Sequence, residues 1–283
     1  MGSEVHLAVD TMSGDLGLRV SVPASLQILQ QQPHLHLHLI GEPHALEESL
    51  SAHAVRDASR IQIIPSTAVI AMDARPAAVL RRAAGSSIQV ALDHLKAGEV
   101  TGLVSAGNTG VLMALARRSI GMLPGYTRPA CCSPFPVKEG RCYMLDLGAN
   151  VDCSAQHLHE FAAMGSVLAS ALDDIQSPRV ALLSNGSEEG KGNDSIRLAY
   201  QRIKEDKQLN FVGAIEGSLL HNGIADVIVC DGLLGNVALK VAEGTASLAA
   251  ELVRESFTRH WWSRITGLLA APQLRDVSTS LSV

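Results

Sequence analysis

Short apolar runs, each closed by a turn, alternate along this chain with segments whose apolar residues recur at helical spacing. Runs of this length are typical of buried strands, and the segments between them are typical of helices. Alternating strands and helices form parallel βαβ units, in which helices cover both faces of a sheet. We therefore expect an α/β protein built on a mostly parallel sheet. The runs are residues 5–9, 35–40, 61–64, 102–105, 142–147, 179–183 and 225–230.

The segments between the runs predict the helices. Two helices are expected to fill residues 76–97 and to meet near Gly85, and a long helix is expected to start at Val237 and to run past Val253. The stretch 124–136 holds four prolines, which interrupt regular structure. Further helices are expected at residues 19–31, 43–52, 155–172 and 195–203, and from a turn at 106–110 to residue 118.

No internal repeat or low-complexity linker divides the 283 residues, a length that suits one large α/β domain or two smaller ones. We expect a single α/β catalytic domain over residues 1–283. Within it, residues 237–270 are expected to form the long helix and a segment that contacts either a membrane or a second copy of the chain. The tryptophans and arginines of 257–269 have the composition of an interfacial membrane contact. A dimer seam or an exposed core helix is the alternative.

Composition limits the partners and the location of the protein. Aromatic residues make up only 3% of the chain and the net charge is −5, which argues against base stacking and against a general polyanion partner. We therefore expect no nucleic acid. The five cysteines lack framework or zinc-site spacing and fit free thiols in a reducing cytosol. Because we find neither a leader peptide nor an apolar run of membrane-spanning length, we expect a cytoplasmic protein.

Histidine and leucine alternate over residues 34–39. This alternation predicts a strand with His34, His36 and His38 on one face. Three histidines on one face can chelate a metal, but a solvated or edge face explains the pattern more simply. We therefore assign no metal ligands.

Loops that contain glycine together with asparagine or aspartate follow most of the apolar runs. Such residues are common in tight turns of any protein. However, the carboxyl ends of parallel strands meet at one edge of a sheet, where open α/β sheets bind ligands. We therefore expect a shared site at this edge. The polar residues concerned are Asp10, Asp15, Asn108, Asn150, Asp152, Lys191, Asn193, Asp231 and Asn236.

The loop SNGSEEGKGND at residues 184–194 is the strongest candidate within that site. Its three glycines let backbone amides approach an anion, while Lys191 and the following helix start add positive charge. It is not a Walker A loop, because three residues rather than four separate Gly186 from Gly190, and glycine follows the lysine. The residues alone leave two interpretations open, an anion-binding loop and a flexible turn. Candidates for the helix N-cap are Asn193, Asp194 and Ser195.

Several strings resemble the PlsX family of phosphate acyltransferases. The most specific are SAGNTG at residues 105–110 and LDLGANVDC at 145–153, and the resemblance extends in order over nearly the whole chain. In the first loop, Ser13 and Leu18 replace a glycine and a proline that are usual in the family. In the loop 184–190, several positions depart from the family pattern NIGEEE-x-KG. Family members also continue past the last residue of this chain, so the resemblance describes it as C-terminally short.

The resemblance implies a three-layer α/β/α fold, similar to isocitrate and isopropylmalate dehydrogenases and to phosphate acetyltransferases. It also implies a homodimer that transfers a fatty acyl group from acyl carrier protein to inorganic phosphate. The acyl phosphate then feeds a membrane glycerol-3-phosphate acyltransferase that begins phospholipid synthesis. A cytoplasmic location with peripheral contact at the inner face of the membrane fits this hand-off. Basic surfaces that can dock the acidic carrier, or that are simply solvated helix faces, are Arg81-Arg82, Arg117-Arg118 and the basic residues of 197–207.

Attack of phosphate on a thioester requires a held phosphate, donors for the carbonyl oxyanion and a cation or proton donor near the leaving thiolate. It requires no serine or cysteine nucleophile, no cofactor and no metal, although clustered aspartates offer ligands for Mg²⁺. For the catalytic step we select Lys191, Asn193, Asn236 and Asp231. For phosphate or substrate binding we select Gly14, Asp15, Asn108, Thr109, Asn150, Asp152, Gly190 and Gly192. Asp15, Asp152 and Asp231 are alternative general bases. Each selected residue could instead serve only as a turn cap or a brace. Asp10 and Asp146 are expected to be structural.

Other functions stay open at this point. One is a phosphate acyltransferase that uses acyl-coenzyme A instead of the carrier protein. Another is a catalytically impaired paralogue that acts as a binding or scaffold protein, which the altered loop 184–190 and the short C-terminus suggest. An NAD-dependent decarboxylating dehydrogenase is disfavoured, because no GxGxxG string follows the first apolar run.

Overall fold

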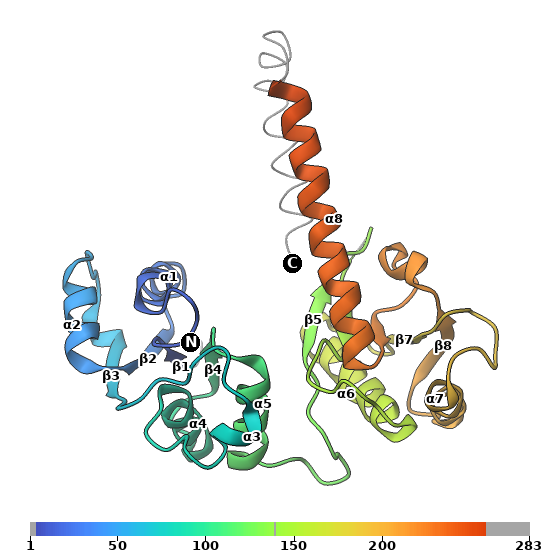
Figure 1. The fold of residues 1–283 in the computed structure, drawn as a ribbon, viewed down its shortest axis with the longest axis horizontal. Helices are drawn as coiled ribbons and strands as arrows, with labels where there is room; N and C mark the ends of the chain where they lie inside the picture. The colour runs from blue at the N-terminus through green and yellow to red at the C-terminus, as the bar shows by residue number, and fades with distance from the viewer. Residues whose placement is uncertain (1–3, 139, 259–283) are drawn as a thin grey trace. The chain divides into compact units, whose positions relative to one another are not determined.

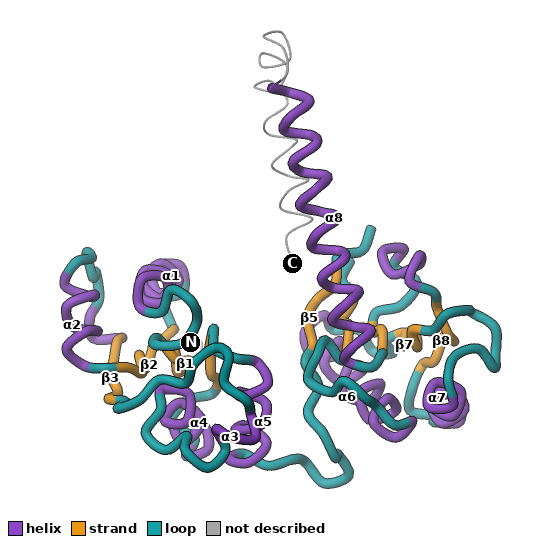
Figure 2. Tube along the Cα trace, in the orientation of Figure 1, coloured by secondary structure: helices purple, strands orange, loops and turns teal. Residues whose placement is uncertain are grey.

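The computed structural model describes residues 4–138 and 140–258. The chain forms two compact units, Met1–Gly125 and Tyr126–Val283. Each unit carries its own mostly parallel sheet between layers of helices, so the predicted α/β/α architecture is confirmed (Figures 1 and 2). That both units act as one catalytic domain stays a prediction.

The first unit is built on a fully parallel four-stranded sheet. Its strands are β1 (Val5–Asp10), β2 (Leu35–Gly41), β3 (Ile61–Pro65) and β4 (Gly102–Ser105). They are arranged in the order β3-β2-β1-β4. The helices are α1 (Leu18–Gln31), α2 (Pro43–Ser51), α3 (Pro76–Val79), α4 (Ser87–Ala97) and α5 (Thr109–Ser119), with a short 3-10 helix, η1 (Ala58–Arg60).

Alternate residues of these strands point to opposite faces of the sheet and build two cores. Leu35, Leu37 and Leu39 of β2 pack against α1 and α2. On the opposite face, Ala8 of β1 and Ile40 pack against α4. The alternating pattern therefore places helices on both faces, as predicted.

The prediction of a solvated or edge face for the histidines of residues 34–38 is wrong. β2 lies between β1 and β3, so it is an inner strand. His34 precedes the strand, while His36 is partly buried and His38 is buried on the face that α4 covers. The pattern of alternation cannot tell a polar face that meets water from one that meets another polar cluster.

The second unit is built on a five-stranded sheet. Its strands are β5 (Cys132–Phe135), β6 (Cys142–Leu145), β7 (Arg179–Leu183), β8 (Asn210–Ile215) and β9 (Val227–Val229). Their order is β5-β6-β9-β7-β8, and only β5 is antiparallel to its neighbour. The helices are α6 (Ala155–Asp173), α7 (Asp194–Glu205) and α8 (Gly232–Thr258), with a 3-10 helix, η2 (Gly217–Asn222).

Two strands of this sheet escaped prediction, and both lie at its edges. β5 contains Pro134, which cannot donate a ladder hydrogen bond and is tolerated on an edge strand. β8 contains Gly213 and pairs with β7 through an irregular register. Neither strand has the continuous apolar run that identifies an inner parallel strand.

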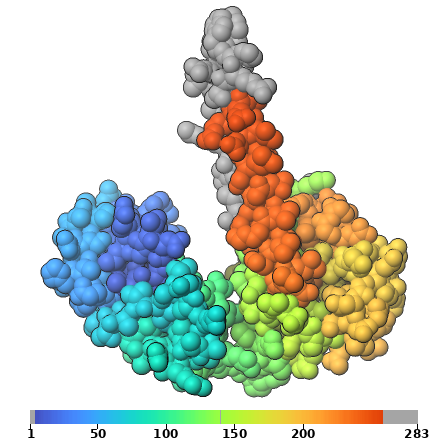
Figure 3. Space-filling view, in the orientation of Figure 1, coloured from blue at the N-terminus to red at the C-terminus, as the bar shows by residue number. Residues whose placement is uncertain are grey.

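Helix α8 begins earlier than predicted. Gly232 to Asn236 were expected to form a loop, but they are the first residues of the helix. Beyond its first turns, α8 stands clear of the sheet of its own unit, and Val241, Leu248 and Leu252 are more than half exposed (Figures 1 and 3). Within the described residues, no helix combines the length and the apolar character that crossing a membrane requires. Most of the predicted contact segment, residues 259–270, lies outside the described residues.

An ion pair joins the first residue of β7 to the segment before β9. The Asp226 carboxylate accepts hydrogen bonds from the backbone nitrogen, Nε and Nη2 of Arg179 at 2.7, 3.1 and 2.8 Å. The Asp226 side chain is 14% exposed, whereas that of Arg179 is 45% exposed. Burial raises the pKa of Asp226, but the bonds from Arg179 outweigh burial and hold the pKa below its ordinary value.

Asp226→Asn is therefore expected to lower the free energy of unfolding at pH 7 by about 2 kcal/mol, less than for a fully buried pair because Arg179 reaches solvent. A carboxyl group with a depressed pKa stabilises the fold above its unfolded pKa of about 3.9, and this stabilisation is lost as the pH falls through the folded pKa. Denaturant unfolding at pH 7 and pH 3 measures the effect. The exposed control Asp174→Asn should change nothing, and an equal loss at both pH values would contradict the assignment.

Candidate active site

The loops that follow β1 and β4 pack against each other in the first unit. A Cβ atom built on Gly14 would lie only 3.0 Å from the Cβ atom of Ala106. This approach brings Gly14 and Asp15 beside the start of α5, where Asn108 and Thr109 lie. The structure thus brings together the predicted site residues of this unit, and the side chains of Asp15 and Thr109 are exposed.

Asn108 uses its side-chain amide within the fold. Its Oδ1 accepts a hydrogen bond from the Val111 amide at 3.0 Å and caps α5. Its Nδ2 donates to the carbonyl oxygens of Met72 and Ala74 at 2.7 and 3.4 Å. A substrate oxyanion would compete for these same two donors, so the structure gives Asn108 the role of a cap and brace.

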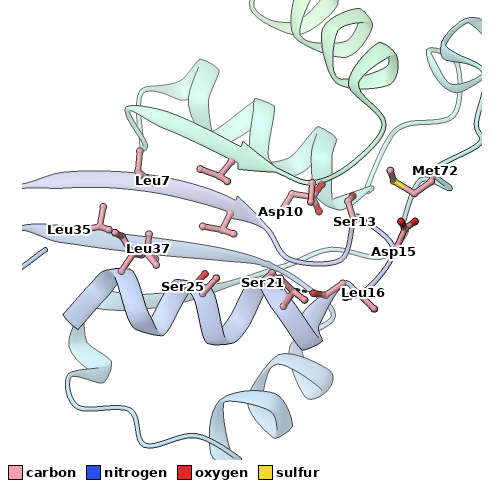
Figure 4. Close-up of a pocket in the computed structure, with 18 residues that line it drawn as sticks. Leu7, Asp10, Ser13, Asp15, Leu16, Ser21, Ser25, Leu35, Leu37 and Met72 are labelled. Carbon is pink, nitrogen blue, oxygen red and sulfur yellow. Dashed lines mark hydrogen bonds between the residues drawn. The ribbon is translucent and has the colours of Figure 1, made fainter. Parts of the chain in front are cut away.

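An apolar groove of about 650 Å³ lies beside these loops (Figure 4). Its apolar end is lined by Leu7, Leu35 and Leu37 from the strands, whereas Ser13 and Asp15 lie at its other end (Figure 4). The groove therefore runs along the sheet from an apolar interior to the polar loop after β1.

Helix α1 supplies one wall of this groove. Leu16, just before the helix, and Val20 and Ile28 within it line the groove at multiples of four residues, beside the stripe that packs into the core. Leu16, Val20 and Val104 are 56%, 51% and 54% exposed. Apolar surface gathered in a groove with a polar end is typical of a ligand site. The second apolar stripe on α1 was the sequence signal for this groove, and it lies outside the strand-end loops from which the site residues were predicted.

Asp10 ends β1 at the polar end of the groove and is 2% exposed. Its Oδ2 accepts a hydrogen bond from Ser105 Oγ at 2.7 Å. Its buried Oδ1 has no hydrogen-bond partner among the described residues. A buried carboxylate oxygen is costly unless a donor satisfies it. Asp10 was expected to be structural, and its bond to Ser105 agrees with that role.

In the second unit, Asp146 organises the loop that follows β6. Its buried carboxylate accepts hydrogen bonds from the amides of Cys131, Ala149 and Asn150 at 2.8, 3.1 and 2.6 Å. It also accepts one from Asn150 Nδ2 at 2.9 Å. These bonds turn the chain after Leu145, which is why β6 ends two residues earlier than predicted. The structural role expected for Asp146 agrees with this geometry.

Asn150 is itself a brace in this loop. It is 6% exposed, and its Nδ2 also donates to the Pro129 carbonyl oxygen at 2.8 Å. Its own carbonyl oxygen accepts a hydrogen bond from the Gly232 amide at 2.8 Å. Asp152, two residues later, is exposed. Of these two predicted binding residues, the structure therefore leaves only Asp152 open to solvent.

The first turn of α8 packs onto the same loop. Asp231 Oδ1 accepts a hydrogen bond from the Leu234 amide at 2.8 Å, the bond that an N-cap residue makes. Asn236 is exposed, and its side chain lies over Gly148, because a Cβ atom built there would be 3.6 Å from Asn236 Cβ. Asp231 and Asn236 therefore lie at the start of helix α8, which packs on the loop after β6, and not in a loop of their own. Their catalytic roles stay predictions.

The loop between β7 and α7 leaves Lys191 accessible. Asn193 caps α7 by accepting a hydrogen bond from the Ile196 amide at 2.9 Å, which confirms one predicted N-cap candidate. Lys191 is exposed and forms no ion pair with any residue that the structure describes. Gly192 has φ of +89°, a conformation that residues with a side chain rarely adopt. The loop therefore presents an uncommitted ammonium group beside a glycine backbone.

Strand order places three of these loops at one edge of the second sheet. β6, β9 and β7 are adjacent and parallel, so their carboxyl ends lie together. The loop organised by Asp146, the start of α8 and the loop of Lys191 follow these three ends. These three loops therefore share an edge within the second unit, whereas the loops of Asp10, Asp15 and Asn108 follow strands of the other sheet, and a single site shared by all of them stays a prediction.

The cysteines are poor nucleophiles in this environment. Burial raises the pKa of all five thiols, to about 12 for Cys132 and Cys142 and to about 11 for Cys153. Thiols rather than thiolates therefore predominate at neutral pH. The site agrees with a transfer chemistry that uses no cysteine nucleophile.

Comparison with known proteins defines the family. The family described as "Fatty acid synthesis protein" matches residues 5–283. The phosphate acyltransferase of Halorhodospira halophila is 48% identical over 275 residues, which cover 97% of this chain and 80% of that protein. The phosphate acyltransferase of Pseudomonas fluorescens is 47% identical over 276 residues, which cover 98% of this chain and 82% of that protein.

Solved structures show the same fold at low sequence identity. The EutD phosphotransacetylase from Staphylococcus aureus matches with a TM-score of 0.60 at 20% identity, over 86% of this chain and 83% of that one. A branched-chain phosphotransacylase from Enterococcus faecalis matches with a TM-score of 0.51 at 14% identity, over 83% of each chain. The fold is thus of the phosphotransacetylase class.

The relatives described above identify the family within this fold class. The chain belongs to the phosphate acyltransferase family, which confirms the resemblance to PlsX proteins. It is an acyltransferase of the kind that transfers an acyl group to phosphate.

Proposed function

We propose that this chain takes its fatty acyl group from the thioester of acyl carrier protein and delivers it to inorganic phosphate. Family membership supports acyl transfer to phosphate. The observation that carries the acyl assignment is the groove of the first unit, whose apolar walls end at the polar loop of Gly14 and Asp15. A substrate with a hydrocarbon tail and a reactive polar head matches such a groove.

In the proposed reaction, a phosphate oxygen attacks the thioester carbonyl carbon. A carbon–oxygen bond forms, the carbon–sulfur bond breaks, and the carrier leaves as a thiolate that takes up a proton. Lys191 supplies positive charge, and the amides of Gly190 and Gly192 supply donors, for the phosphate or the carbonyl oxyanion. Its exposure and its lack of an ion pair among the described residues support this role.

The groove holds the acyl chain in this proposal. Burying a methylene group in an apolar site contributes about 0.8 kcal/mol, so a long chain binds more tightly than a short one. Within the first unit, the chain would lie along α1 with its apolar tail at the end of Leu7, Leu35 and Leu37 in Figure 4.

A comparison of donors tests the proposal. Purified protein is given phosphate with a long-chain acyl carrier protein or with the matching acyl-coenzyme A, and acyl phosphate is trapped with hydroxylamine. We expect a higher kcat/KM with the carrier protein. Preference for the coenzyme A ester would replace the carrier in this proposal, and no product with either donor would favour the scaffold alternative.

A substitution in the groove should lower kcat/KM more for long-chain acyl donors than for short-chain ones. Val20→Gln places an amide where the acyl chain would lie. Displacement of two methylene groups from the groove corresponds to about a tenfold loss of binding affinity. We expect kcat/KM to fall about tenfold for a long-chain donor and to change little for a short-chain one. The control is Leu172→Gln, a helix position that is 61% exposed and lies outside the groove. Equal losses for both chain lengths would contradict an acyl groove.

The proposal extends to partners. We propose a cytoplasmic homodimer that makes peripheral contact with the membrane and passes its product to a membrane glycerol-3-phosphate acyltransferase. Val241, Leu248 and Leu252 support a contact surface, because they expose apolar side chains on one face of α8. Size-exclusion chromatography with light scattering, run with and without vesicles, distinguishes self-association from lipid binding.

A further inference from the structure

A cluster of histidines lies at the amino ends of β1 and β2. His6 and His36 are directly opposite each other in the strand register, and their rings stack with centroids 4.7 Å apart. Glu4 precedes β1, and its carboxylate oxygens lie 3.9 Å from Nε2 of His6 and 3.9 Å from Nε2 of His36. One ligand atom of each of these three residues lies within 4.8 Å of the others.

A fourth side chain supports this group from the inside. His6 Nδ1 lies 3.3 Å from Nε2 of His38, which is 8% exposed. Histidines that bind metals usually donate their second ring N–H to a buried acceptor, which fixes the ring and the tautomer. If Nδ1 of His6 donates to His38, Nε2 of His6 carries the lone pair that a metal ion would accept, 3.9 Å from the Glu4 carboxylate.

We propose that Glu4, His6 and His36 form a binding site for a divalent first-row transition ion such as Zn²⁺ or Ni²⁺. Imidazole and carboxylate donors suit these ions. Ligand atoms about 2 Å from a tetrahedral ion lie about 3.3 Å apart, so the ligand atoms, now within 4.8 Å of one another, must move closer and the stacked rings of His6 and His36 must turn toward the ion. The Glu4 side chain is 68% exposed and is free to make it.

This site is separate from the proposed acyl-transfer chemistry. His6 and His36 lie at the amino ends of their strands, whereas Asp10 and the loop of Asp15 follow the carboxyl end of β1. The metal would tie β1, β2 and the segment before β1 together. Its removal is therefore expected to lower stability and to leave acyl transfer unchanged.

Metal titration of the full chain tests the proposal. Chelator-treated protein is titrated with NiCl₂ by calorimetry, and the melting temperature is recorded with and without the ion. Nickel is chosen because thiolates prefer softer ions, and the buried thiols of this chain are protonated. We expect one site per chain, and weakening of at least tenfold in both Glu4→Gln and His36→Gln, since even the loss of a residue that only hydrogen-bonds to a metal ligand costs 10- to 100-fold.

The control is His44→Gln, an exposed histidine outside the cluster, which should bind nickel as the wild type does. Glu4→Gln alters an exposed side chain before the strand, so it tests the site even if the His36 variant folds poorly. Absence of nickel binding by the wild type, or the same affinity in the wild type and Glu4→Gln, would overturn the proposal.

Discussion

Gly235→Ala is expected to lower the free energy of unfolding by about 3 kcal/mol or more, because the new methyl group has no room. Gly235 lies in the first turn of α8, against the loop after β6. A Cβ atom there would collide with the carbonyl oxygen of Asp146 and would lie 2.8 Å from Cys230 Sγ. Backbone atoms cannot rotate away as a side chain can, so the helix start must shift.

Gly244→Ala is the matched control in the same helix. A Cβ atom at Gly244 meets nothing within 4 Å. Alanine is more stable than glycine in a helix interior by about 0.5–1 kcal/mol, so this change should stabilise the protein. Denaturant unfolding of both variants gives the comparison. A loss of stability at Gly244 or none at Gly235 would contradict the packing of α8 on the Asp146 loop.

Lys191→Ala is expected to reduce kcat/KM for acyl phosphate formation about 10²- to 10³-fold, as loss of an oxyanion donor does. The physical reason is the loss of a positive charge beside the glycine amides that receive phosphate or the oxyanion. The melting temperature should not change, since Lys191 is exposed and makes no ion pair within the described part of the chain. Steady-state kinetics with varied phosphate measure both kcat and KM.

Two further variants serve as comparisons for Lys191→Ala. Lys191→Arg keeps the charge and should retain more activity than alanine does. Lys240→Ala removes an exposed lysine that pairs with Glu243 at 2.7 Å, and it should leave kinetics unchanged. Near-normal turnover and phosphate affinity in Lys191→Ala would exclude the assigned role.

Most strands and most helices could be predicted because buried strands appear in the sequence as apolar runs. β1, β2, β4 and β7 begin where the runs begin. The edge strands β3 and β4 of the first sheet were predicted in the same way, because each carries an apolar run, whereas β5 and β8, the edges of the second sheet, could not be. β5 needs only one covered face and carries Pro134, so its composition is that of a loop.

The sequence indicated which loops hold the candidate site residues, but it did not indicate the role of each residue. Glycine and asparagine after the strands correctly indicated tight, polar loops. The same residue types serve as caps, braces and ligand donors, and only their partners separate these roles. Asn108 and Asn150 are held by backbone groups, whereas Lys191 is exposed. Asp231 and Gly235 were expected in a loop, because glycines needed for close packing resemble glycines needed for turning.

The groove and the histidine cluster depend on contacts that a single segment of sequence does not show. The histidine cluster arises from residues that are far apart in sequence and meet through strand pairing, and the groove needs the paired strands as well as helix α1. The register that aligns His6 with His36 also sets Leu7 beside Leu37 on the opposite face. A single strand shows the alternation, but the neighbouring strand decides whether a face becomes a core, a groove or a polar cluster.

Transfer of an acyl group from a carrier thioester to phosphate is tested by measuring the acyl phosphate that the purified full chain forms. Long-chain acyl carrier protein is incubated with increasing phosphate, and the product is trapped as a hydroxamate. We predict hydroxamate that rises with phosphate until saturation, with release of one carrier thiol per product. Folded protein that yields no phosphate-dependent hydroxamate would contradict the account.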